Sequence, residues 1–363
     1  MTKKHRLIRA SLIGAGTFAA TACWFDGDLK HDTGVTPEPL EDGWQVAAPE
    51  DVGLDVAVLD QIHQQLLRED RYRGTLSLLV LKDGKLVWET YLRRRSDQAE
   101  YRNIQSATKS VTSLLFGIAL DQGSIPSLEL TLGELFPDEV AGLDPRKAVI
   151  TLHDLLTMRS GIAFDNEHFS VEMWVDSPSQ PLRYMLEKPL YADPGARYYY
   201  RDVDPQLVGY ALTRLTGRSE EQLATETLFA ALDIHDYFWE AGSDGVSMAA
   251  HGLQLLPRDL AKLGQLVLDR GLWRGQRVVS EEWLELSTSE QVLSDSEYHD
   301  GVFPYGYYWW IVPGVGFSAW GHGGQYVLVV PSRNLVLVQT AFPDTDFSDS
   351  DLSSFLQLVQ PLL

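Results

Sequence analysis

The chain has 363 residues, of which 44% are hydrophobic, and its formal net charge is −21 at pH 7. This length suits one large domain with an insertion, and the composition can supply a substantial core. The phosphate backbone of a nucleic acid would repel a surface this acidic, which argues against nucleic-acid partners.

The first 22 residues have the pattern of a secretory signal peptide. A basic start, MTKKHR, precedes a mostly apolar run from Leu7 to Ala22 that is too short and too weakly apolar for a stable membrane span. Cys23, the only cysteine, follows directly and looks like the lipid-attachment cysteine of a bacterial lipoprotein. The alternative is a plain secretory signal with an incidental cysteine. In both cases we expect an exported protein of the bacterial periplasm or cell envelope, without a disulfide in the monomer.

A flexible tether is predicted over residues 23–43, which are polar and acidic and contain two prolines. Residues 44–363 are predicted to form one domain. Its first elements are a helix over 55–70, from the spacing of apolar residues, and a hairpin whose two β-rich runs meet at Asp83-Gly84.

The middle of the chain, roughly 121–250, consists mostly of helical patterns. Strand-like runs such as QYVLVVPSRNLVLVQTAF then return, and the helical segment DLSSFLQLVQPLL closes the chain. We therefore predict an α/β fold of the α+β type, in which the terminal segments share one antiparallel sheet flanked by helices and the middle forms a mostly helical lobe. A functional site is expected in the cleft between the two parts.

Ser106 and Lys109 open an apolar helical run, RNIQSATKSVTSLLFGIAL. At positions i and i+3 they share one helix face. The positive end of the helix dipole favours an oxyanion near the serine, and a desolvated lysine can act as a base, so the pair could form a nucleophile. By itself this spacing fits an ordinary surface helix as well.

Two distant segments support the chemical interpretation. In DPGARYYYRDVDPQLVGYAL, a Pro194-Gly195 turn precedes a tyrosine run and a helix. In WGHGGQYVLVVP, small residues open a strand, where glycines let a substrate approach the strand edge.

Together these motifs resemble the serine β-lactamase and penicillin-binding-protein superfamily, over nearly all of residues 44–363. The most similar branch contains the class C β-lactamases and related DD-peptidases, esterases and aminohexanoate-oligomer amide hydrolases. Ser106-Ala107-Thr108-Lys109 matches its Ser-x-x-Lys motif. Pro194-Gly195 followed by Tyr200 matches Pro-Gly…Tyr-x-Asn, and His322-Gly323-Gly324 matches the strand motif Lys-Thr-Gly in its His-x-Gly form.

The resemblance implies a catalytic role for three residues. Ser106 would be the nucleophile, and Lys109 would hold or take its proton. Tyr200 would be a second general base or acid that passes a proton to the leaving group. Tyr198 and Tyr199 are its rivals by proximity, and the family spacing selects Tyr200.

The resemblance also implies an oxyanion hole and a substrate-binding surface. The hole would consist of the backbone N–H groups of Ser106 and Gln325. The residues expected to bind substrate are Asp202, His322, Gly323 and Gly324.

The family pattern is broken at two positions. Asp202 stands where the family has asparagine, and near Lys109 it would favour the charged ammonium. His322 stands in place of a lysine, which removes a fixed cation suited to a substrate carboxylate. Arg201 could bind that carboxylate instead. Both changes favour esters or simple amides over β-lactams and peptidoglycan.

Three functions follow as hypotheses. The first is a secreted serine hydrolase that acts through an acyl-enzyme on an ester or amide. The second is a β-lactamase or DD-peptidase, and the third is a catalytically silent envelope protein of the same fold. No spacing typical of zinc ligands is present, so we expect neither a metal nor a cofactor. The expected partner is a small-molecule ester, amide or β-lactam-like substrate. Membrane contact is expected only through a lipid at Cys23.

Overall fold

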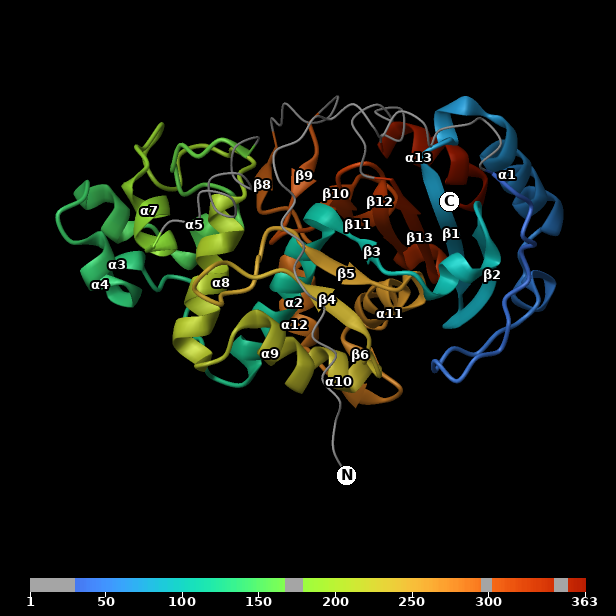
Figure 1. The fold of residues 1–363 in the computed structure, drawn as a ribbon, viewed down its shortest axis with the longest axis horizontal. Helices are drawn as coiled ribbons and strands as arrows, with labels where there is room; N and C mark the ends of the chain where they lie inside the picture. Colours follow the sequence, from blue (N-terminus) through green and yellow to red (C-terminus); the bar gives the residue numbers. More distant parts are fainter. Residues whose placement is uncertain (1–29, 167–178, 295–301, 343–351) are drawn as a thin grey trace, which may run out of the picture.

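The computed structural model describes residues 30–166, 179–294, 302–342 and 352–363. The predicted signal peptide and Cys23 lie outside these ranges. An eight-stranded sheet with only antiparallel neighbours, in the order β2-β1-β13-β12-β11-β10-β9-β8, forms the centre of the fold (Figure 1). Its strands are β1 (Thr75–Lys82), β2 (Lys85–Tyr91), β8 (Val292–Leu293), β9 (Pro304–Tyr305), β10 (Trp310–Val312), β11 (Gly316–Gly321), β12 (Gln325–Val330) and β13 (Leu335–Ala341). The terminal segments therefore share one antiparallel sheet, as predicted.

Each face of the sheet is covered by helices because alternate residues of the central strands are apolar on both sides. Helices α1 (Val56–Arg68) and α13 (Leu352–Val359) pack on one face, around the side chains of Leu78, Val80 and Leu328. Helices α2 (Thr108–Asp121) and α11 (Pro257–Leu268) pack on the other face and belong to the main core.

The first hairpin of the sheet follows the turn chemistry of its sequence. Asp83 and Gly84 separate β1 from β2 and have φ values of 52° and 74°. Both values lie in the left-handed region that a two-residue hairpin turn requires. The predicted position of this hairpin is therefore confirmed.

The middle of the chain forms the helical lobe, which extends from the left of Figure 1 to its lower centre. Its helices are α3 (Leu132–Leu135), α4 (Pro137–Val140), α5 (Leu152–Leu156), α7 (Pro181–Glu187), α8 (Val203–Thr216), α9 (Glu220–Glu226) and α10 (Leu228–Leu232). A small sheet of β3 (Arg102–Asn103), β5 (Leu253–Leu255) and β4 (Tyr237–Trp239) adjoins the lobe. The remaining elements are α12 (Glu281–Ser287), β6 (Leu272–Trp273) and β7 (Gln276–Arg277).

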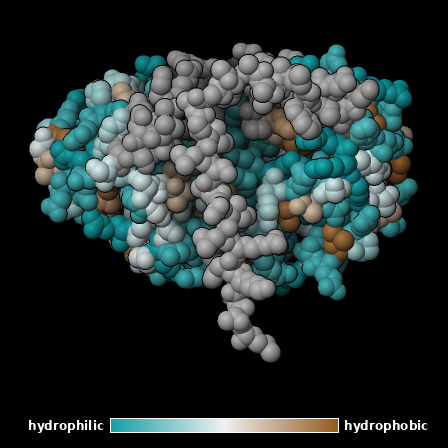
Figure 2. Space-filling model, viewed as in Figure 1, coloured by the Kyte–Doolittle hydropathy of each residue, from teal (hydrophilic) through white to brown (hydrophobic). Residues whose placement is uncertain are grey.

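The surface in view is mostly hydrophilic, with hydrophobic residues scattered over it (Figure 2). This agrees with the large excess of acidic over basic residues in the chain. Among the described residues, no helix combines the length and the apolar character that a membrane span requires.

Residues 30–47, here called the N-terminal strap, lie along the sheet edge formed by β2. Four backbone hydrogen bonds hold the strap there: His31 N–Leu92 O at 2.8 Å, Glu89 N–Val35 O at 3.1 Å, Leu86 N–Gln45 O at 2.9 Å and Ala47 N–Leu86 O at 3.3 Å. The structure thus differs from the predicted tether, since residues 30–43 are bound to the body of the protein. The open strand edge offers backbone partners that composition alone does not reveal.

Arg258 of α11 fixes the middle of the strap. Its buried guanidinium lies 2.8 Å from Asp42 of the strap and 2.7 Å from Glu89 of β2, and it donates to the Glu38 carbonyl at 2.9 Å. The Trp44 indole donates to the Arg258 carbonyl at 3.1 Å. Strap, edge strand and core helix are therefore joined through one buried cation.

Glu220, the first residue of α9, is a fully buried acid between α9, α2 and α8. A Cβ atom added at Gly209 of α8 would lie 2.9 Å from its carboxylate. Burial raises the pKa of Glu220 to about 8, from an ordinary value of 4.5, and nearby Thr112 only partly offsets this effect. The folded protein therefore keeps this proton at a pH where the unfolded chain has lost it.

We expect Glu220→Gln to flatten the dependence of stability on pH. Because its pKa is raised, the contribution of Glu220 to the free energy of unfolding is fully present below about pH 4.5 and is lost as the pH rises through about 8. The variant should match the wild type near pH 5 and exceed it at pH 8.5 by roughly 2–4 kcal/mol in free energy of unfolding, measured with urea. Glu226→Gln, on the exposed side of α9, is the control and should leave the pH dependence unchanged. A wild-type pH dependence in Glu220→Gln would contradict this expectation.

Candidate active site

Ser106 lies in a single turn of 3₁₀-helix, Gln105–Ala107, that leads into α2. Its side chain is half-buried. Gln105, just before it, has a φ of 52°, and its N–H donates to the Asn103 side chain at 2.9 Å. A positive φ at a residue other than glycine is strained, and here it stands directly beside the predicted nucleophile.

Lys109 is buried one turn further along α2, and its ammonium contacts Ser106, Ala250 and Asp202 in addition to the Tyr200 phenol. The Nζ atom lies 3.0 Å from Ser106 Oγ, 2.9 Å from the Ala250 carbonyl and 2.7 Å from Asp202 Oδ1. The structure therefore brings Ser106, Lys109 and Asp202 together.

The charge of Lys109 results from two opposing effects. Burial by itself lowers its pKa, whereas the Asp202 carboxylate and the Tyr200 phenol, through charge and hydrogen bonding, raise it. The net pKa of Lys109 is raised above its ordinary value. Lys109 therefore remains an ammonium near neutral pH.

Tyr200 is the tyrosine of the predicted run that meets Lys109. The ammonium lies 4.9 Å from the centroid of its half-buried ring. Tyr198 is buried against Tyr305, with 5.6 Å between ring centroids, and Tyr199 is covered by the Arg201 guanidinium at 3.1 Å. The family spacing thus selected the ring that contacts Lys109.

Asp202 immediately precedes α8, and Asn166 links it to Tyr200. The Asp202 N–H donates to Asn166 Oδ1 at 2.8 Å, and the Asn166 amide donates to the Tyr200 carbonyl at 3.3 Å. Arg201 is buried, stacks on Tyr199 and donates to the Tyr200 carbonyl at 3.0 Å. Its guanidinium therefore supports this loop.

The turn between β11 and β12 leads into the predicted oxyanion residue Gln325, the first residue of β12. His322 is exposed, and Gly323 and Gly324 have φ values of 76° and 97°, which favour glycine. The Gln325 side chain is buried, donates to the Ala341 carbonyl at 2.7 Å and accepts from the Ala341 N–H at 3.0 Å. These bonds fix the start of β12, where the Gln325 N–H is located.

Gly321 brings this turn against the segment that contains the nucleophile. It pairs with Gln325, and a Cβ atom at this position would lie 2.1 Å from the Ile104 carbonyl oxygen. That oxygen belongs to the backbone two residues before Ser106, so a side chain would push apart the two segments expected to form the oxyanion hole.

We expect Gly321→Ala to lower kcat by about 10²-fold, because displacements near 1 Å at a reacting centre have effects of this size. Overpacking should also cost about 1–3 kcal/mol of stability. The control is Gly264→Ala in α11, where a Cβ would lie 2.6 Å from Val336 Cγ1, in the core. It should lose stability and keep kcat, and equal kcat losses in both variants would contradict a local effect.

His251 is a residue of this site that the sequence argument missed. Its side chain is half-buried, and the backbone on both sides of it is held at the site. The carbonyl of Ala250, just before it, accepts a hydrogen bond from Lys109, and the carbonyl of Leu253, two residues after it, accepts one from the Ile104 N–H at 3.0 Å. Burial and the charge of Lys109 lower the pKa of His251, while Asp202 opposes this effect. No local motif in the sequence marks the position of His251.

His153 has a structural environment in α5. Its ring contacts the Tyr307 hydroxyl at 2.8 Å and the Arg159 guanidinium at 2.8 Å. Across the described parts of the chain, no group of three or more His, Cys, Asp or Glu residues could hold a metal ion.

Comparison with known families gives a match over most of the chain. The family model described as Beta-lactamase matches residues 59–342. A 6-aminohexanoate-dimer hydrolase from Paenarthrobacter ureafaciens is 24% identical over 296 residues, which cover 75% of this chain and 74% of that protein. An Escherichia coli (strain K12) protein, provisionally named a D-alanyl-D-alanine carboxypeptidase, is 22% identical over 211 residues. That match covers 52% of this chain and only about half (48%) of the relative.

Solved structures agree on the fold. A penicillin-binding protein homologue from Pyrococcus abyssi, described as octameric, superposes with a TM-score of 0.66 at 20% identity, over 85% of this chain and 78% of its own. A family VIII carboxylesterase superposes with a TM-score of 0.65 at 17% identity, over 88% of this chain and 99% of its own.

Proposed function

Since this chain belongs to the beta-lactamase family of serine hydrolases, we propose that it hydrolyses a small ester or amide through an acyl-enzyme formed on Ser106. The observation that carries this proposal is the position of the Lys109 ammonium. It lies 3.0 Å from Ser106 Oγ and 4.9 Å from the Tyr200 ring centroid, and Asp202 holds it from the other side at 2.7 Å.

In the proposed acylation step, Ser106 Oγ attacks the substrate carbonyl carbon and its proton passes to the Tyr200 phenolate. Lys109 keeps its own proton, since its pKa is raised, and its charge stabilises the phenolate. The tetrahedral oxyanion accepts hydrogen bonds from the backbone N–H groups of Ser106 and Gln325. Tyr200 then protonates the leaving alcohol or amine, and the acyl-enzyme forms.

Deacylation uses the same groups in reverse roles. A water molecule gives its proton to Tyr200 and attacks the acyl carbonyl, and the proton returns to Ser106 as the acid is released. Only proton transfers and carbonyl chemistry are needed, so the proposal requires no redox step.

The charges around Ser106 support neutral esters and amides as substrates. Asp202 pairs with Lys109, His322 replaces the lysine of the strand motif, and Arg201 is stacked within its own loop. None of these three provides the fixed cation that a β-lactam or peptidoglycan carboxylate needs. The similarity to a protein named 6-aminohexanoate-dimer hydrolase points in the same direction.

The test combines active-site labelling with a substrate panel. A fluorophosphonate probe should label folded wild-type protein, and peptide mass analysis should locate the adduct on Ser106. The panel contains p-nitrophenyl esters, a linear aminohexanoate amide, nitrocefin and a D-Ala-D-Ala peptide, and we expect turnover of the first two. Preferred turnover of nitrocefin or the peptide would support the β-lactamase or DD-peptidase alternative, and failure to label would favour a silent binding protein.

We further propose that the protein is exported to the cell envelope and anchored by a lipid at Cys23. The basic start, the apolar run and the lone cysteine support this proposal. Labelled palmitate should be incorporated by the wild type and not by Cys23→Ala, and equal incorporation in both would contradict it.

A further inference from the structure

A buried tryptophan lies against the ring of Tyr200. The indole of Trp310, in β10, stacks on this ring with 5.6 Å between centroids and 29° between planes. Trp310 is 5% exposed, whereas Tyr200 is half-buried. The tyrosine with the proposed proton-transfer role is thus partly exposed and has a buried indole against one face of its ring.

Trp310 is itself held in place by its neighbours. It stacks on Trp320 of β11 at 4.4 Å with 13° between planes, and it meets Tyr305 edge-on at 4.7 Å. Its backbone pairs with Tyr305 on one side and with Ser318 on the other. The orientation of the indole is therefore fixed by the sheet and by two aromatic contacts.

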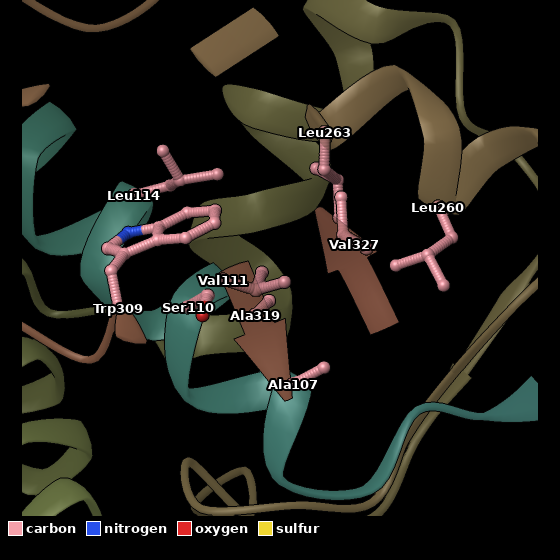
Figure 3. Close-up of a pocket in the computed structure, with 9 residues that line it drawn as sticks. All are labelled: Ala107, Ser110, Val111, Leu114, Leu260, Leu263, Trp309, Ala319 and Val327. Atoms are coloured by element: carbon pink, nitrogen blue, oxygen red, sulfur yellow. The ribbon is translucent and has the colours of Figure 1, made fainter. Parts of the chain in front are cut away.

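The adjacent Trp309 has a different environment. It lines a small, mostly apolar cavity between α2, α11 and the sheet, together with Leu114, Leu263 and Val327 among others (Figure 3). It is more deeply buried than Trp310, at 1% exposure. Of the two consecutive tryptophans, Trp310 therefore contacts Tyr200, whereas Trp309 packs in the core and can serve as its control.

We propose that Trp310 is a positioning residue that fixes the ring of Tyr200 so that its hydroxyl faces Lys109 and Ser106. This inference rests on the role proposed for Tyr200 above. The Tyr200 ring also meets Tyr305 edge-on, with 6.4 Å between centroids, and the Lys109 ammonium lies 4.9 Å from its centroid. Trp310 is the neighbour that stacks on the flat face of the ring and so restricts its rotation about the side-chain bonds. Stacking removes that freedom before substrate binds, and such preorganisation increases kcat more than substrate affinity.

The experiment compares Trp310→Leu and Trp310→Phe with Trp309→Leu. Trp310→Leu should lower kcat for a p-nitrophenyl ester by about 10- to 100-fold with KM changed less than about threefold, and Trp310→Phe should recover most of the loss. Trp309→Leu should lose comparable stability in urea and keep kcat. Rates are expressed per folded protein, measured by circular dichroism.

A double-variant cycle with Tyr200→Phe tests whether Trp310 acts through Tyr200. If it does, adding Trp310→Leu to Tyr200→Phe changes the residual rate of fluorophosphonate labelling by less than about threefold. If Trp310→Leu lowered the labelling rate of the Tyr200→Phe protein as much as it lowers that of the wild type, the inference would be overturned. Equal kcat losses for Trp309→Leu and Trp310→Leu would overturn it as well. Both outcomes would leave the proposed function intact. Full activity of Tyr200→Phe would remove the role of Tyr200 and with it this inference. Absence of labelling in the wild type would contradict the proposed function itself.

Discussion

Replacing Ser106 with alanine is expected to lower kcat/KM for every substrate that the wild type hydrolyses by at least about 10³-fold. The Oγ atom is the proposed nucleophile, and it lies 3.0 Å from Lys109 Nζ at the start of α2. Removing it leaves the ammonium with the Ala250 carbonyl, Asp202 and the Tyr200 phenol as partners. The free energy of unfolding should therefore change by less than about 1 kcal/mol.

The matched control is Ser110→Ala, one turn further along the same helix. The Ser110 hydroxyl is buried and donates to the Tyr308 carbonyl at 2.7 Å. Its loss should cost about 1 kcal/mol or more of stability and leave turnover nearly unchanged. Both variants are measured by initial rates and by urea unfolding. A Ser106→Ala protein that turns over substrate like the wild type would rule out the acyl-enzyme.

Replacing Lys109 with methionine is expected to lower both activity and stability. Activity should fall by about 10³-fold, because the charge beside Ser106 and Tyr200 disappears. Stability should fall by about 3–5 kcal/mol, because Asp202 loses its partner while its side chain stays largely buried, at 13% exposure. Initial rates and urea unfolding measure the two losses separately.

A second substitution separates the two effects of losing Lys109. In Lys109→Met/Asp202→Asn the uncompensated charge is gone, so much of the stability should return while activity remains low. Asp202→Asn alone should keep a folded protein, and its Lys109 should lose its ammonium proton at a lower pH, because Asp202 is the main charge that raises this pKa. If the double variant were no more stable than Lys109→Met, the cost would have to come from lost packing.

Local features of the site and of the fold could be predicted well from sequence. The spacing of Ser106 and Lys109 on one helix defines their separation without any tertiary information. The turn at Asp83-Gly84 likewise depends only on residues that tolerate a positive φ. Three motifs in the expected order then supplied the fold and the choice of Tyr200.

Contacts between distant segments could not be predicted in this way. His251 reaches the site because the loop after β4 is pinned to α2 and to the backbone at Ile104. The supporting role inferred for Trp310 depends on the angle between two rings, which no spacing in the sequence encodes. The polar composition of residues 30–43 predicted a tether, whereas a complementary strand edge and Arg258 bind them.

The N-terminal strap has a consequence for how the protein behaves when it is shortened. A chain that begins at Trp44 would leave most of β2 as an open edge of the sheet and would remove Asp42 from the buried Arg258. Unpaired backbone along an edge strand is a template for adding a strand from another molecule. The shortened protein is therefore expected to self-associate in solution, whereas a chain that begins before Lys30 should stay dispersed.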